Sequence, residues 1–160
     1  MLIRAAEPRD APAIGQILLP IVRAGETLAM DRGMSEREAV AQWAGPGRVA
    51  FVAEAGGEVL GVYYIRPNQG GGGSHVCNCG YATAVGATGR GVGRAMCEHS
   101  LVQARLMGYR AVQFNFVVSS NARAVALWRS CGFAEVGRLP GAFLHPTLGC
   151  VDALVMFRAV

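Results

Sequence analysis

Apolar positions along the chain recur with the two periods that distinguish strands from helices. Alternating or short continuous apolar runs predict strands at residues 2–6, 49–53, 59–65, 75–84, 111–118, 133–136 and 150–157. Apolar residues three or four apart predict helices that begin near Asp10, Ser35, Gly91 and Asn121. The order of elements, with no repeat and no linker, predicts one α/β domain that spans residues 1–160.

Local signals predict where several of these elements begin and end. Asp10 is expected to cap the first helix, and Pro20 is expected to kink or end it. Ser35 to Glu38 forms a capping box, which predicts the start of the second helix. Gly132 is in the position that closes the last helix, and Gly56-Gly57 provides a tight turn between two strands.

The composition narrows the class of protein. Hydrophobic residues make up 52% of the 160 residues, which is enough for a buried core, and no apolar run is long enough to span a bilayer. The N-terminus does not resemble a signal peptide, so we expect a cytoplasmic protein with no membrane partner.

Charge and cysteine content exclude several kinds of chemistry. All 15 basic residues are arginine, so lysine nucleophiles, Schiff bases and P-loop lysines are absent. The arginines are scattered, so nucleic acid is not an expected partner, although the net charge of +4 would favour a polyanionic ligand. His75, Cys77 and Cys79 alternate on one strand, but the five cysteines form no CxxC pair and no metal is expected.

Residues 88–94, Thr-Gly-Arg-Gly-Val-Gly-Arg, lie between a predicted strand and a long helix. Glycines allow close approach of a ligand, and the first amides of a helix have no internal partner, so this turn is suited to a pyrophosphate. Taken alone, such a turn is equally typical of an ordinary chain reversal that binds no ligand. The dinucleotide fingerprint fails because Arg94 and Met96 stand where its third glycine belongs.

Two motifs carry a resemblance to a known family. Thr88 to Gly93 resembles the Q/R-x-x-G-x-G/A loop of GNAT N-acetyltransferases, with Thr88 in place of the usual glutamine or arginine. Asn121 to Phe133 resembles the family's second motif, N-x-x-A-x-x-L-Y-x-x-x-G-F. The resemblance covers about residues 83–133. It implies the GNAT fold: a mixed, largely antiparallel twisted sheet of seven strands with four helices, in which two central strands splay apart.

The same resemblance implies acetyl-CoA as co-substrate and a set of residues that bind it. Backbone groups of Thr83 and Val85 would bind the pantetheine arm, and Asn121 would also contact it, although Asn121 is equally typical of a helix cap. The remaining expected cofactor residues are Thr88, Gly89, Arg90, Gly91, Val92, Gly93, Arg94 and Trp128.

Trp128 stands where many relatives have a tyrosine that protonates the departing thiolate. An indole N–H is not an acid at ordinary pH, so water, the thiol itself or another side chain would complete the proton transfer. Core packing is the other interpretation of Trp128. The strand 75–84 also lacks the glutamate that some relatives use as a base, so Glu26 becomes the candidate base and Asp152 a second one.

Three asparagines provide the remaining indication of the acceptor substrate. Asn78, Asn115 and Asn121 lie on or beside the two strands expected to splay, and buried amides need hydrogen-bond partners. The pattern resembles fungal proline-analogue acetyltransferases, and the segments 137–140 and 151–154 resemble phosphinothricin-type ones. Both resemblances imply an amino-acid-like amine as acceptor. Acetylation of protein N-termini and acyl-CoA sensing without turnover are the alternatives, and family habit suggests a homodimer.

Overall fold

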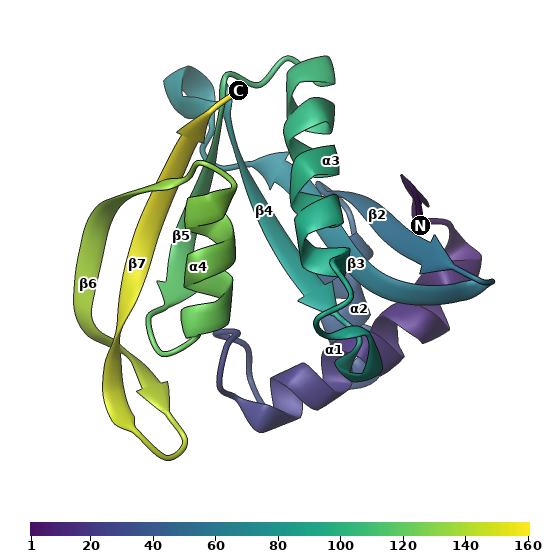
Figure 1. The fold of residues 1–160 in the computed structure, drawn as a ribbon, viewed down its shortest axis with the longest axis horizontal. Coiled ribbons are helices and arrows are strands. Elements are labelled where there is room, and N and C mark those ends of the chain that lie inside the picture. Colours follow the sequence, from purple (N-terminus) through teal and green to yellow (C-terminus); the bar gives the residue numbers. More distant parts are fainter.

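A single seven-stranded sheet runs through the computed structural model, which describes all residues from 1 to 160 (Figure 1). Its strand order is β1-β2-β3-β4-β5-β7-β6. The strands are β1 (Leu2–Ala5), β2 (Val49–Ala55), β3 (Glu58–Pro67), β4 (Val76–Thr83), β5 (Ala111–Val118), β6 (Ala134–His145) and β7 (Gly149–Ala159). Only β4 and β5 pair in parallel. The predicted fold class, a largely antiparallel mixed sheet with four helices, is confirmed.

The helices cover both faces of this sheet. They are α1 (Ala11–Ala24), α2 (Glu36–Ala44), α3 (Val92–Leu106) and α4 (Ala122–Ser130). In Figure 1, α3 and α4 lie in front of the sheet, whereas α1 and α2 lie behind it. Because side chains alternate along a strand, Phe51 and Tyr63 pack into the core beneath α3 and α4, and Val52 and Val62 pack under α1 and α2. No helix combines the length and the apolar composition that a bilayer crossing requires.

The two central strands separate soon after they meet. β4 and β5 pair only at Val76 with Ala111 and at Cys77 with Val112, and then they diverge (Figure 1). At the fork, the Asn78 Nδ2 group donates to the carbonyl oxygen of Gln113 over 3.0 Å. The edge of β4 beyond this point therefore has no strand beside it, and the gap connects the two faces of the sheet.

The first helix begins after Asp10 as predicted, but it does not end at Pro20. The helix continues past Pro20 to Ala24, because burial of Ile17, Leu18 and Val22 outweighs the one hydrogen bond that a proline removes. Asp10 does not cap the helix with its side chain. Its carboxylate instead accepts two hydrogen bonds from Arg4, at 2.7 and 2.9 Å, and one from the Glu7 N–H.

The sixth strand is much longer than the predicted segment 133–136, because it runs from Ala134 to His145. Eight of its twelve residues are exposed and only Phe143 is buried, so the apolar pattern gives no sign of it. Pairing with β7 alone holds it in the sheet, and the register shifts between Leu139 and Phe143, around Pro140. An edge strand tolerates such a proline because its N–H side faces solvent.

Candidate active site

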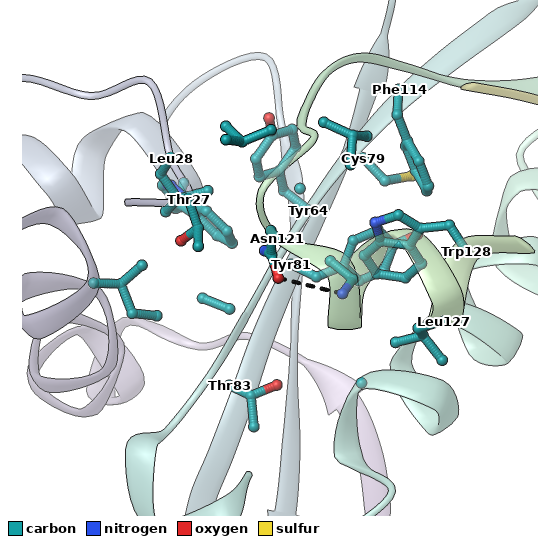
Figure 2. Close-up of a pocket in the computed structure, with 18 of the residues that line it drawn as sticks. Thr27, Leu28, Tyr64, Cys79, Tyr81, Thr83, Phe114, Asn121, Leu127 and Trp128 are labelled. Carbon is teal, nitrogen blue, oxygen red and sulfur yellow. Dashed lines mark hydrogen bonds between the residues drawn. The ribbon is translucent and has the colours of Figure 1, made fainter. Parts of the chain in front are cut away.

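The gap between β4 and β5 opens into a cavity of about 820 Å³. The loop between α1 and α2 forms one wall, and the N-terminal ends of α3 and α4 form the other. Figure 2 shows Tyr64 and Tyr81 between the loop residues Thr27 and Leu28 on one side and Trp128 on the other. The cavity therefore runs through the sheet, with one end at the Gly-rich turn and the other under α2.

The Gly-rich turn presents unused backbone donors at one end of the cavity. Gly89 and Gly91 have positive φ angles of 86° and 79°, a region that side chains rarely adopt, and Gly91 is the residue before α3. The N–H groups of Gly91, Val92, Gly93 and Arg94 make no hydrogen bond in the structure. Four unpaired amides at a helix N-terminus form a site for a phosphate-type anion.

Two arginines add positive charge at this end. Arg94 lines the cavity and donates to the Ser130 hydroxyl over 2.8 Å. The Arg123 guanidinium reaches toward the turn, because a Cβ atom placed on Gly89 would lie 3.6 Å from its Nη2 atom. Thr88 also lines the cavity, whereas Arg90 does not.

Strand β4 offers a second row of backbone groups. The Ala84 N–H donates to the Leu60 carbonyl over 2.9 Å, and the Asn68 N–H donates to Val76 over 2.9 Å. In an antiparallel pair every second residue bonds to the neighbour, so residues 76, 78, 80, 82 and 84 point their N–H and C=O groups toward β3. Residues 79, 81 and 83 point theirs into the gap. Thr83 is thus placed as expected, but Val85 is not a strand residue: it lies in a 3₁₀ turn, is 72% exposed and is outside the cavity lining.

Asn121 serves the helix and also borders the cavity. Its Oδ1 atom accepts the Ala124 N–H over 3.3 Å, the bond drawn as a dashed line in Figure 2. Since the same side chain lines the cavity, its two expected roles are compatible in this position.

Trp128 is only 9% exposed and belongs to an aromatic cluster. Its ring centroid lies 4.9 Å from that of Tyr81 and 5.0 Å from that of Phe114. The Tyr81 hydroxyl is bonded to the Ser100 hydroxyl over 2.6 Å, and burial raises the pKa of Tyr81 far above its usual range. This wall of the cavity therefore carries no side chain that readily releases a proton.

Asn78 and Asn115 both lie on the α2 side of the gap, and each is hydrogen-bonded to Gln113. Asn78 Oδ1 accepts from the Tyr64 hydroxyl and from Arg66 Nε, both over 3.3 Å, and its amide nitrogen donates to Gln113. The Asn115 amide nitrogen donates a hydrogen bond to Asn68 over 2.7 Å, and its oxygen accepts one from Gln113 over 2.9 Å. Each amide keeps one N–H free, so both residues can still donate to a ligand.

Sequence reasoning missed the other side chains at this end. Arg48, Tyr64 and Arg66 line the cavity, together with Trp43 of α2, whose ring lies edge-on to Tyr64 with the centroids 5.2 Å apart. The available signal was Arg66 itself, a charge that ends the apolar run of β3. Glycine at position 80 belongs to the same arrangement, since a Cβ atom there would lie 2.5 Å from Tyr64 Cε1.

Neither candidate base borders the cavity. Glu26 is exposed and outside the lining, although Thr27 beside it is included. Asp152 accepts from the Gly141 N–H and from Arg138, both over 2.9 Å, and these bonds hold the pKa of its carboxyl below the usual value. No aspartate or glutamate lines the cavity at all.

Comparison with known proteins identifies the family that has this architecture. The acetyltransferase (GNAT) family model matches residues 21–133, a span that contains both walls of the cavity. The chain therefore belongs to the acetyltransferase (GNAT) family.

Individual relatives agree with that membership. A GCN5-related N-acetyltransferase from Kribbella flavida is 43% identical, with a TM-score of 0.93 and coverage of 99% of this chain and 97% of that one. A phosphinothricin acetyltransferase from Sinorhizobium meliloti, solved with acetyl-CoA, shares the fold at 21% identity, with a TM-score of 0.87 and coverage of 99% and 88%.

Among curated proteins, the N-acetyltransferase aca1 of Schizosaccharomyces pombe is 33% identical over 98 residues, which is 61% of this chain. The aligned part is 47% of that relative, so the match spans about half of its length.

Proposed function

We propose that this protein transfers an acetyl group from acetyl-CoA to the nitrogen of a small, amino-acid-like amine. The observation that carries the proposal is the row of unpaired amides at Gly91 to Arg94, beside the open edge of β4. Both features face one cavity, so a single long ligand can use both.

The residues present fit acetyl-CoA. The amides of Gly91 to Arg94 would bind its pyrophosphate, and Arg94 and Arg123 would balance the phosphate charge. The free edge of β4, at residues 79, 81 and 83, would hold the pantetheine arm by backbone hydrogen bonds in the manner of an added strand. Bound in this way, acetyl-CoA supplies a thioester to the part of the cavity in front of Tyr81 and Asn78.

The acceptor amine has to arrive without its proton, and the cavity favours that form. Arg48 and Arg66 keep their charge when phosphate balances Arg94 and Arg123, and no carboxylate lines the cavity, so the positive field at that end lowers the pKa of an ammonium group inside it. The acceptor first loses one proton to water. Its nitrogen then bonds to the acetyl carbon while the carbon–sulfur bond breaks, and the second proton passes to the departing sulfur. No protein acid is needed, in keeping with an indole at Trp128.

An assay of CoA release tests this function. Acetyl-CoA is mixed with amino acids, polyamines and short peptides, and free thiol is measured. Thiol release with one or more amino acids is expected. Release only with peptides would instead favour an N-terminal acetyltransferase, and tight acetyl-CoA binding without release would favour a sensor.

Two further properties are part of the proposal. The exposed side chains of Val136, Leu139, Leu144 and Leu148 on the hairpin of β6 and β7 favour a homodimer formed through this edge, which light scattering would test. All five cysteines are free, which is typical of the reducing cytoplasm.

A further inference from the structure

Both ends of the cavity carry arginines, and neither end carries a negatively charged side chain. Arg94 and Arg123 lie beside the Gly-rich turn, where the diphosphate is proposed to bind. Arg48 and Arg66 lie at the other end, in the row that contains Asn78. From Asn78 to Thr83 an extended strand covers about 16 Å, so one diphosphate cannot satisfy both pairs of arginines.

Arg48 directly precedes β2, and Arg66 lies near the end of β3. Val49 pairs with Ile65, so Arg48 and Arg66 each lie one residue beyond the last paired position of these two strands. Arg66 in turn pairs with Asn78 on β4. Like charges held close together repel each other unless an opposite charge lies between them.

The protein supplies no such charge. The arginines that form salt bridges are Arg4, Arg9, Arg94, Arg129 and Arg138. Arg66 donates only to the neutral amide of Asn78, and Arg48 stacks on the Tyr64 ring with its guanidinium carbon 5.5 Å from the ring centroid. Arg48 Nε is also the one buried side-chain polar atom in the structure without a hydrogen-bond partner. A buried donor left unpaired is costly, so a ligand that pairs with it gains affinity.

We infer that Arg48 and Arg66 form a subsite for a carboxylate carried by the acceptor. The inference rests on the proposed function and narrows it: the acceptor is an amine that also bears an acid group. Guanidinium groups bind carboxylates through paired, charge-assisted hydrogen bonds, and the ring of Tyr64 holds Arg48 in position for this. Diamines and polyamines are excluded because they would bring positive charge to a cavity that has no negative side chain.

Acceptors matched in shape and different in charge test this subsite. Initial rates are measured for the standard amino acids, for the carboxamide of the best one, and for putrescine. We expect the free acid to exceed its carboxamide by about 30-fold in kcat/KM and putrescine to be inactive. A carboxamide or diamine used as well as the acid would overturn the subsite.

Variants assign the effect to the two arginines. Arg48→Gln and Arg66→Gln should each lower kcat/KM for the acid by about 10- to 100-fold, mainly through KM, while rates with the carboxamide fall by less than about threefold. Arg37→Gln removes an equal charge from an exposed position outside the cavity and should change neither substrate. Equal losses for the acid and its carboxamide would show a structural role instead and overturn the inference.

Binding measurements separate this inference from the proposed function. Calorimetry with the same acids is carried out on the protein alone and on the protein saturated with CoA. Failure to bind CoA contradicts the proposed function, while acid binding that depends on Arg48 and Arg66 still upholds the subsite. If no acid binds in either state, the subsite is wrong, whatever the result for CoA.

Discussion

The two ends of the cavity are built from different parts of the polypeptide. At the Gly-rich turn the donors are backbone N–H groups of consecutive residues, Gly91 to Arg94. At the other end, where the acceptor is proposed to bind, the contacts are side chains of Arg48, Tyr64, Arg66 and Asn78, which come from β3, β4 and the residue before β2.

Because of this difference, we expect the backbone site to keep one ligand and the side-chain site to vary in the ligand it selects. A backbone site needs only glycines and a helix start, so it binds one ligand in a fixed way. A side-chain site changes its chemistry with each substitution and leaves the fold intact. We therefore expect substitutions at the turn to affect acetyl-CoA, and substitutions around Tyr64 to affect the acceptor alone.

Substitution of Gly91 by aspartate should have the largest effect. The carboxylate would lie among the amides proposed to bind phosphate, and repulsion of about 4 kcal/mol at close range corresponds to a loss of about 1000-fold in CoA affinity. Gly91 also has a φ of 79°, which adds strain for any side chain. Calorimetry with CoA measures the change. The control is Gly86→Asp, in an exposed turn outside the cavity lining, and equal affinities of the two variants would contradict a phosphate site at Gly91.

Substitution of Gly80 by alanine should affect the other end. The new Cβ atom would meet the Tyr64 ring at 2.5 Å, so the ring has to move away from Asn78 and Arg48. We expect the acceptor KM to rise about 10-fold, with a loss of about 1–3 kcal/mol in stability, while CoA affinity changes less than about twofold. Gly72→Ala, which has open space around its Cβ position, serves as the control. A fall in CoA affinity would show that the two ends are not independent.

Replacement of Trp128 by phenylalanine tests the proton transfer. Since the indole is assigned to packing and not to acid chemistry, kcat should change by less than about threefold, although stability falls as buried ring area is lost. Thermal unfolding and steady-state rates measure the two effects. A decrease in kcat of about 100-fold at unchanged structure would require a chemical role for the indole.

The smallest effect is expected for Glu26→Gln. With no carboxylate in the cavity, kcat/KM should rise about tenfold per pH unit until the acceptor amine is deprotonated, and it should do so equally in the variant. Burial raises the pKa of Tyr64, so its phenol keeps its proton and adds no second break below about pH 10. Rates measured from pH 6 to 10 test this, and a profile altered by the substitution would restore Glu26 as the base.

The fold and the unpaired amides of the Gly-rich turn could be predicted from the sequence for the same physical reason. Apolar periodicity and glycine-rich turns are local features, and the amides at Gly91 follow from a helix start that the sequence displays. The end proposed for the acceptor depends on strand register, which pairs Val49, the residue after Arg48, with Ile65, and Arg66 with Asn78. No local pattern encodes that register. The length of β6 was missed for a related reason, because an edge strand held by backbone pairing needs no apolar alternation.

Backbone amide NMR with CoA is the most direct test of the proposed function. The protein is labelled with ¹⁵N, the amide signals of Gly91, Val92, Gly93 and Arg94 are assigned, and CoA is added until binding is saturated. The proposal predicts that these amide protons shift downfield together as they donate to phosphate, while the amide of Gly108, beyond the other end of α3, stays unchanged. CoA binding that leaves the four amides unperturbed would contradict it.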